Sequence, residues 1–270
     1  MTNSLGAWKN APLAYVLAEV RTEMIANLKD YQPKIGGRFR DEYPIQRTMH
    51  AAKLVASENQ ILIEPSQDSA WEFASPDNRT GVILRSNGVV LHATTYIDSI
   101  DFLGRLQKVI SLVAEEIPSV YVNRLGLRYI DFIFPHKNQL PEIYVDPRLN
   151  PDLGLTNKDD NATATTSIAV YPMENGTLTL RYMRGPGKPE LPPDLKNLSL
   201  EKSQLMNQSP ESSVTAILDT DRIYTRTPVE PVGRLDPVWV REKFELLHKD
   251  VSEAFKKAIT AYARKEWGGT

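Results

Sequence analysis

Alternating apolar and polar positions run through most of the chain and predict a protein rich in β-strands. The segment from Leu13 to Arg21 is a clear example, because its apolar residues recur at every second position. Two Asn-Gly pairs, at residues 87–88 and 175–176, separate apolar runs and predict tight hairpin turns. We predict strands at residues 13–21, 46–56, 60–65, 69–75, 80–86, 89–97, 120–134, 163–171, 177–184, 213–218 and 222–227.

Two segments show instead the spacing of amphipathic helices, with an apolar residue at every third or fourth position. Ser99 precedes the first of them, which ends before Pro118. Asp236 precedes the second, which has Pro237 at its first position and one apolar stripe that continues to about Tyr262. Each predicted helix therefore has one face to bury against the rest of the protein.

These elements predict an α+β protein with a largely antiparallel, curved sheet, or two such sheets, packed by long amphipathic helices. One division gives a β-α-meander-α-β half at residues 1–150 and a β-rich half with the long C-terminal helix at residues 151–270. One continuous domain is the alternative. Residues 185–210 are longer than most ordered loops, so we expect a mobile or functional loop. Residues 127–130 (LRYI) resemble residues 180–183 (LRYM), which indicates either a loose structural duplication or chance.

The composition is that of an ordinary folded protein and limits the classes of function. Of 270 residues, 41% are hydrophobic and 24% are charged, which argues against a disordered or fibrous chain. The formal net charge of -2 gives no chain-wide attraction to nucleic acid or to an anionic membrane, although a local basic patch is compatible with it. The chain has no cysteine, which excludes disulfides and thiolate chemistry. We expect a cytoplasmic protein without membrane association, because no signal segment and no membrane-length apolar run are evident.

The sequence shows no catalytic motif and no pattern typical of a metal or cofactor site. Residues 185–188 (GPGK) resemble a phosphate-binding loop, but the glycine spacing is wrong and Pro189 follows instead of a helix start. The four histidines stand too far apart for a metal-binding motif. The serine motif of hydrolases is absent. We therefore predict no catalytic residue, no metal and no cofactor, and whether the protein is an enzyme stays open.

The most informative polar residues are arginines on predicted strands. Arg124 and Arg128 are four residues apart, so both side chains lie on the same face of their strand. Gly126 stands between them and leaves space for a planar or anionic group. This pair predicts a small binding surface on the sheet.

Other strands contribute further arginines and one carboxylate. Arg181 and Arg184 lie on a later strand, and Glu19 shares a face of the first strand with Arg21. Pairing of these strands would collect several guanidinium groups on one concave surface. The simpler interpretation is an exposed sheet face with solvated or paired arginines. The candidate ligand-binding residues are Arg124, Arg128, Arg181, Arg184, Glu19 and Arg21.

Several short segments resemble a sporadically distributed family of prokaryotic proteins of similar length, to which no activity is assigned. The strongest match is residues 124–130 (RLGLRYI), and the resemblance extends over most of the chain. It implies no catalytic role for any residue. The patchy distribution of the family implies a setting in mobile, defence or toxin-antitoxin systems. The other matching segments are residues 12–13 (PL), 19–21 (EVR), 43–44 (YP), 71–73 (WEF) and the last helix with Phe255 and residues 259–260 (IT).

Together these observations predict a noncatalytic binding or interaction protein, whose partner is another protein or a small anionic ligand. The first alternative is an enzyme or binder that acts on a phosphorylated or polyphosphate-like ligand, with Arg124, Arg128 and Arg181 holding the phosphate. The second alternative is a nucleic-acid-binding protein, in which Tyr129 and Tyr182 stack against bases. The oligomeric state is not predicted.

Overall fold

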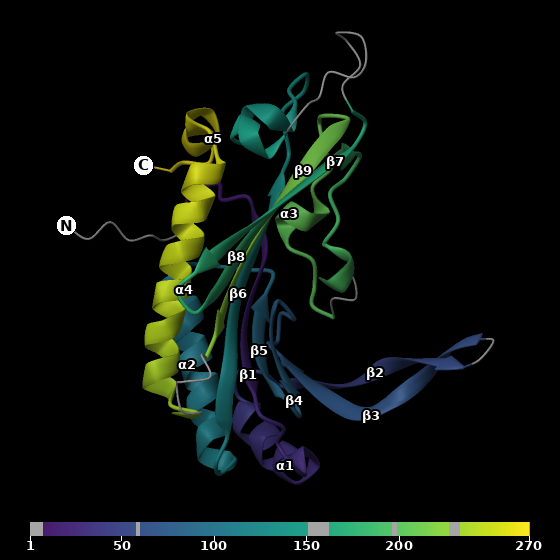
Figure 1. Cartoon of the computed structure of the whole chain (residues 1–270), viewed down its shortest axis with the longest axis vertical. Helices are drawn as coiled ribbons and strands as arrows, with labels where there is room; N and C mark the ends of the chain where they lie inside the picture. The colour runs from purple at the N-terminus through teal and green to yellow at the C-terminus, as the bar shows by residue number, and fades with distance from the viewer. Residues whose placement is uncertain (1–7, 58–59, 151–161, 196–198, 227–232, 270) are drawn as a thin grey trace.

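The computed structural model of the protein describes residues 8–57, 60–150, 162–195, 199–226 and 233–269. Ten strands of these residues form one open sheet, in which each described pair of neighbouring strands is antiparallel (Figure 1). The α+β class with an antiparallel sheet is therefore confirmed. The strands are β1 (Leu13–Thr22), β2 (Ile45–Ser57), β3 (Gln60–Ala74), β4 (Thr80–Arg85), β5 (Gly88–Ala93), β6 (Tyr121–Ile133), β7 (Thr165–Met173), β8 (Gly176–Pro186), β9 (Val214–Thr225) and β10 (Gly233–Arg234).

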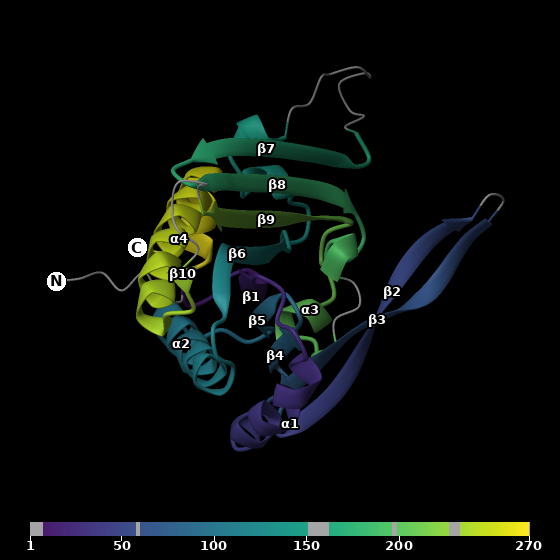
Figure 2. The same cartoon turned by 60° about the horizontal axis from the view of Figure 1, so that its bottom comes forward.

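The order of the strands places β1 and β6 side by side near the middle of the sheet. That order is β2-β3-β4-β5-β1-β6-β9-β8-β7, and β10 pairs with β6. On the side away from β6, β1 pairs with β5, and on the side away from β1, β6 pairs with β9. Residues before and after position 150 therefore contribute to the same continuous sheet. The long hairpin of β2 and β3 extends away from the body of the protein (Figure 2).

The hairpin between β4 and β5 is present, but its turn begins one residue earlier than predicted. Ser86 and Asn87 form the loop, and Gly88 already pairs with Arg85. Gly88 has a φ of 153°, and a Cβ atom there would lie 2.5 Å from the carbonyl oxygen of Val20 on β1. The glycine is therefore required by the close approach of the neighbouring strand.

Two pairs of predicted strands are continuous in the structure. β3 joins the strands predicted at residues 60–65 and 69–75, and β9 joins those predicted at residues 213–218 and 222–227. The second prediction was wrong because Asp219 and Asp221 favour turns when they are considered alone. On the sheet these aspartates contact arginines of neighbouring strands, which compensates the buried negative charge.

Helices α2 and α4 lie side by side on one face of the sheet (Figures 1 and 2). We call this side the helix face. α1 packs beside α2 and β3, whereas the short α3 lies on the opposite side of the sheet. The helices are α1 (Leu28–Phe39), α2 (Ser99–Glu116), α3 (Gln204–Asn207), α4 (Pro237–Ala258) and α5 (Ala261–Glu266), with short 3-10 helices η1 (Pro141–Ile143), η2 (Pro147–Leu149) and η3 (Pro193–Leu195).

The ends of the two long helices show which capping predictions were right. Asp236 caps α4 as predicted, and its carboxylate accepts a hydrogen bond from the N–H of Val238. Asp98 caps α2 in place of the predicted Ser99. The last helix ends at Ala258, not near residue 262, because the following residue adopts an extended conformation and a separate helix α5 begins soon after.

The main hydrophobic core lies between the helix face and the helices. Val16, Ala18 and Val20 of β1 are wholly buried there against residues of α2 and α4, such as Leu106 and Phe244. Burial of each large side chain contributes roughly 1.5 to 3 kcal/mol. Since successive strand residues point to opposite sides, the residues between these three point to the other face. We call that side the arginine face.

Residues 187–195 and 199–212, named the covering segment below, lie against part of the arginine face (Figure 1). Met206 is buried against Tyr15, Ile130 and Phe132 of the sheet. A backbone hydrogen bond also joins the N–H of Glu201 to the carbonyl of Asn78 in the turn before β4. The described parts of the loop predicted at residues 185–210 therefore contribute to a second, smaller core.

Candidate functional site

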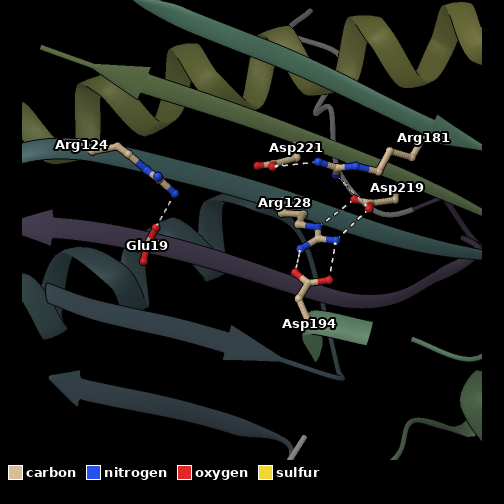
Figure 3. A network of polar contacts seen from close by, with 7 residues as sticks. All are labelled: Glu19, Arg124, Arg128, Arg181, Asp194, Asp219 and Asp221. Atoms are coloured by element: carbon tan, nitrogen blue, oxygen red, sulfur yellow. Dashed lines mark hydrogen bonds and ion pairs between the residues drawn. The ribbon is translucent and has the colours of Figure 1, made fainter. Parts of the chain in front are cut away.

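Five of the six candidate residues share the arginine face. The strand registers place Glu19 and Arg21 of β1 and Arg124 and Arg128 of β6 on this side of the sheet, and Arg181 of β8 joins them through β9. They form two separate groups (Figure 3). The sixth candidate, Arg184, lies three residues beyond Arg181 and points to the helix face, where it forms an ion pair with Glu142 and donates to the carbonyl of Ala162.

The first group is an arginine cluster around Glu19. The carboxylate oxygen Oε1 of Glu19 lies 3.0 Å from Nη2 of Arg85 and 3.3 Å from Nη2 of Arg21, and Oε2 lies 3.0 Å from Nη2 of Arg124. The side chains of the three arginines are 38%, 37% and 32% exposed for Arg21, Arg85 and Arg124, whereas that of Glu19 is 11% exposed. Three guanidinium groups thus surround one carboxylate and remain accessible to solvent.

Crowding of positive charge is evident at Arg85. Burial lowers the pKa of its guanidinium, Glu19 opposes that change, and the charges of Arg21 and Arg124 lower the pKa further. The Nε atoms of Arg21 and Arg124 are buried and donate no hydrogen bond to the described residues. The cluster therefore has an excess of positive charge, which is a property of an anion-binding surface.

Gly126 lies beside this cluster, as the spacing of Arg124 and Arg128 predicted. A Cβ atom at this position would have its nearest contacts with Glu19, at 3.8 Å from the Cβ and Oε2 atoms. These are ordinary van der Waals distances, so the glycine leaves free space next to the carboxylate. The two arginines on either side of it do not share a ligand site, however, because Arg128 belongs to the second group.

The second group joins Arg128 and Arg181 to three aspartates (Figure 3). Asp219 is wholly buried and contacts both arginines, with Nη1 of Arg181 at 3.1 Å from its Oδ2 atom. Asp194 of the covering segment forms a second, short ion pair with Arg128. Asp221 completes the group at 3.8 Å from Nη2 of Arg181. Two positive and three negative groups leave no positive charge for a ligand.

The pKa values of this group follow from its pairing. Burial opposes the charge of Arg128, but hydrogen bonds to Asp219 and Asp194 overcome that cost and raise its pKa. Asp194 is affected in the opposite sense, because the hydrogen bond and charge of Arg128 outweigh desolvation and lower its pKa. The contact therefore holds the covering segment on the sheet, and Arg128 has a structural role.

A third polar group lies under the covering segment and was not recognised in the sequence. Oε1 of Glu72 lies 3.0 Å from Nε2 of His92, and Nδ1 of the same ring lies 3.0 Å from the hydroxyl of Tyr15. Burial opposes the charge of Glu72, but hydrogen bonds from His92, Ser199 and Arg47 lower its pKa to about 2. The hydrogen-bonded series of Glu72, His92 and Tyr15 resembles a proton relay. All three residues are buried, however, so the series connects parts of the core.

The residues that the sequence interpretation missed are Arg85, Asp194, Asp219, Asp221, Glu72 and His92. Arg85 ends a predicted strand, but its proximity to Glu19 depends on the pairing of β1 with β5, which residue spacing does not reveal. Asp219 and Asp221 alternate with Thr220, and this alternation was the available signal that they share one face of a strand.

No model of a known protein family matches the chain, and a comparison with curated proteins also finds no match. Among the described residues, no helix is both long and apolar enough to cross a membrane. The same part of the chain contains no group of three or more histidine, aspartate or glutamate side chains arranged to hold a metal ion. The function must therefore be inferred from the geometry of the arginine face.

Proposed function

We propose that the protein is a noncatalytic binding protein that recognises a small anionic ligand at the arginine cluster formed by Arg21, Arg85, Arg124 and Glu19. The observation that supports this most strongly is the ratio of charges, because three guanidinium groups share one carboxylate. The excess is two positive charges, which suits a doubly charged group. Arginine is also the residue best shaped to donate paired hydrogen bonds to phosphate or carboxylate.

Exposure supports the same assignment. Each arginine of the cluster is about one-third accessible, so an anion can reach the guanidinium groups without opening the sheet. Arg128 is much less exposed and is paired with two aspartates, which makes it a poor competitor for the same ligand. The ligand class that fits is a phosphate ester, a pyrophosphate or a compact dicarboxylate. The small net charge of the chain disfavours an extended polyanion such as nucleic acid.

Binding of inorganic phosphate, pyrophosphate and succinate, measured by isothermal titration calorimetry, tests the proposal. Pyrophosphate is expected to bind the unmodified protein, and the Arg124→Gln variant should bind it at least about tenfold more weakly, since a charged hydrogen bond contributes roughly 1.5 to 3 kcal/mol. The matched control is Arg38→Gln, which removes an exposed arginine of α1 that pairs with Glu115 and Glu116. Absence of binding, or equal binding by Arg124→Gln and Arg38→Gln, would overturn the proposal.

We also infer that the sheet derives from two related halves. In the first, β1 pairs with β5, which continues to β4 and β3, and the helix α2 follows β5. In the second, β6 pairs with β9, which continues to β8 and β7, and α4 follows. The two helices also pack against each other. The similarity between residues 127–130 and 180–183 does not support this repeat. The first segment lies in β6 and the second in β8, whereas the repeat would match β6 with β1 and β8 with β4.

A further inference from the structure

A second potential ligand site lies on the helix face, on the other side of the sheet from the arginine cluster. A cavity of about 120 Å³ lies between β6, β9 and the C-terminal half of α4. Its walls are mainly apolar. The apolar and aromatic residues of that lining include Trp8, Leu13, Tyr96, Tyr129, Val251 and Phe255.

Asp131 is a carboxyl group in the lining of this cavity. Its side chain is buried, lines the cavity and makes no hydrogen bond or ion pair with any other residue that the structure describes. A carboxyl group without a protein partner is costly to ionise at such a position, because little solvent reaches its oxygen atoms. A ligand that donates a hydrogen bond would satisfy such a position.

Thr220 provides an independent observation at the same place. It lines the cavity from β9, and its Oγ1 atom is buried without a hydrogen-bond partner among the described residues. The strand register places Thr220 opposite Tyr129, two residues from Asp131 on the same face of β6. Asp131 and Thr220 therefore line the same apolar cavity from neighbouring strands.

Titratable groups on the packed elements also face this space. His248 of α4 lies against the ring of Tyr129, with the ring centroids 6.1 Å apart, and its Nε2 atom is 3.3 Å from the hydroxyl of Ser252. Burial, followed by the charge of Lys256, lowers the pKa of His248, which favours the neutral ring. The hydroxyls of Tyr96 and Tyr129 bond each other at 3.2 Å. Asp131 and Thr220 therefore line the cavity in company with His248, Ser252 and Lys256.

We propose that this cavity binds a small molecule with a single apolar ring and one hydroxyl or N–H group, which donates a hydrogen bond to Asp131. The size supports one ring, because an engineered cavity of about 150 Å³ holds benzene. The polar group would lie at the Asp131 and Thr220 end, and the ring would contact Val251 and Phe255. This site differs from the arginine cluster in face, charge and ligand class.

Three probes of similar size test the proposal on the unmodified protein, with binding measured by ligand-observed NMR. Phenol carries a donor, anisole carries an oxygen without a donor, and toluene carries neither. Above pH 8, where the Asp131 carboxylate is ionised and can only accept, phenol should bind about tenfold more tightly than anisole and toluene, as expected for one hydrogen bond to a buried acceptor. Equal affinities for the three probes, or no binding of phenol, would overturn the proposal without any variant.

Two substitutions then test whether Asp131 and Thr220 cause the preference for phenol. Asp131→Leu should reduce the advantage of phenol over toluene to less than about threefold while toluene still binds. Thr220→Val keeps the shape of the side chain and should reduce the same advantage by a smaller factor. If the leucine variant does not fold, the valine variant and the probe series still decide the question. A phenol preference that both variants retain would place the contact elsewhere and contradict the assignment.

Discussion

Arg128 and Asp219 form a bidentate pair across the neighbouring strands β6 and β9. The Nε atom of Arg128 lies 2.9 Å from Oδ1 of Asp219, and Nη2 lies 2.8 Å from Oδ2. The strand register pairs Arg128 with Asp221, so the bidentate partner is the diagonal neighbour. Both guanidinium edges are occupied, because Asp194 contacts the remaining nitrogen. The arginine that stood out in the sequence thus stabilises the sheet and its covering segment.

Replacement of Asp219 by alanine is predicted to destabilise the protein strongly. The substitution leaves Arg128 and Arg181 without their shared buried counter-charge, and loss of one member of a buried ion pair costs about 3 to 5 kcal/mol. Asp194→Ala is the matched comparison. Its carboxylate contacts the same arginine but is 61% exposed, so solvent screening should limit the loss to about 1 kcal/mol.

Urea unfolding monitored by circular dichroism measures both free energies. The Asp219→Ala protein should show the lower midpoint, and the slope of the transition should change little if the native state stays intact. Equal losses in the two variants would contradict the assignment of Asp219 as the central acceptor of the group.

Glu19→Gln tests the role of the carboxylate in the arginine cluster. Glu19 neutralises part of the charge of Arg21, Arg85 and Arg124, and an incoming anion must share the guanidinium groups with it. Glutamine keeps the size and can accept hydrogen bonds, but it removes the negative charge. We expect pyrophosphate to bind about threefold to tenfold more tightly, with a steeper decrease in affinity as salt is added.

Calorimetric titration of both proteins at low and high salt measures this change. The control is Glu23→Gln, since Glu23 follows β1 and contacts Asn123 instead of an arginine of the cluster. Unchanged or weaker binding by Glu19→Gln would mean that the carboxylate positions the arginines for the ligand, contrary to the competition described above.

Much of the fold is predictable from local patterns, whereas the composition of the polar groups is not. Alternation identified most strands, and capping chemistry identified the start of α4 at Asp236, because both signals are contained in neighbouring residues. The continuity of β9 was missed, since its aspartates are compatible with a strand only when β6 and β8 supply Arg128 and Arg181. That information is distant in the sequence.

The candidate site shows the same limit. The shared face of Glu19 with Arg21, and of Arg124 with Arg128, follows from strand periodicity alone. The same rule would have separated Arg184 from Arg181, because three residues along a strand reverse the face. The division of the arginines into one charged cluster and one neutralised group depends on strand order, and a single sequence does not specify it.

Asp131 provides a prediction about pH. Burial, with a smaller contribution from the charge of Asp219, raises the pKa of its carboxyl from 3.8 to about 8. At a pH between these two pKa values, the carboxyl keeps its proton in the folded protein and loses it in the unfolded chain. The contribution of this group to stability is therefore fully present below about pH 4 and is lost as the pH rises through about 8.

Asp131→Asn removes this titration and keeps the shape of the side chain. The variant should gain stability relative to the unmodified protein as the pH rises from 5 to 7, by about 2 to 3 kcal/mol, since each unit of pH within this window corresponds to roughly 1.4 kcal/mol. Urea unfolding across the pH range measures the difference, and Asp41→Asn, on the exposed turn after α1, is the control. A constant difference between the asparagine variant and the unmodified protein would show that the buried carboxyl is already ionised, because only a retained proton makes the gain depend on pH.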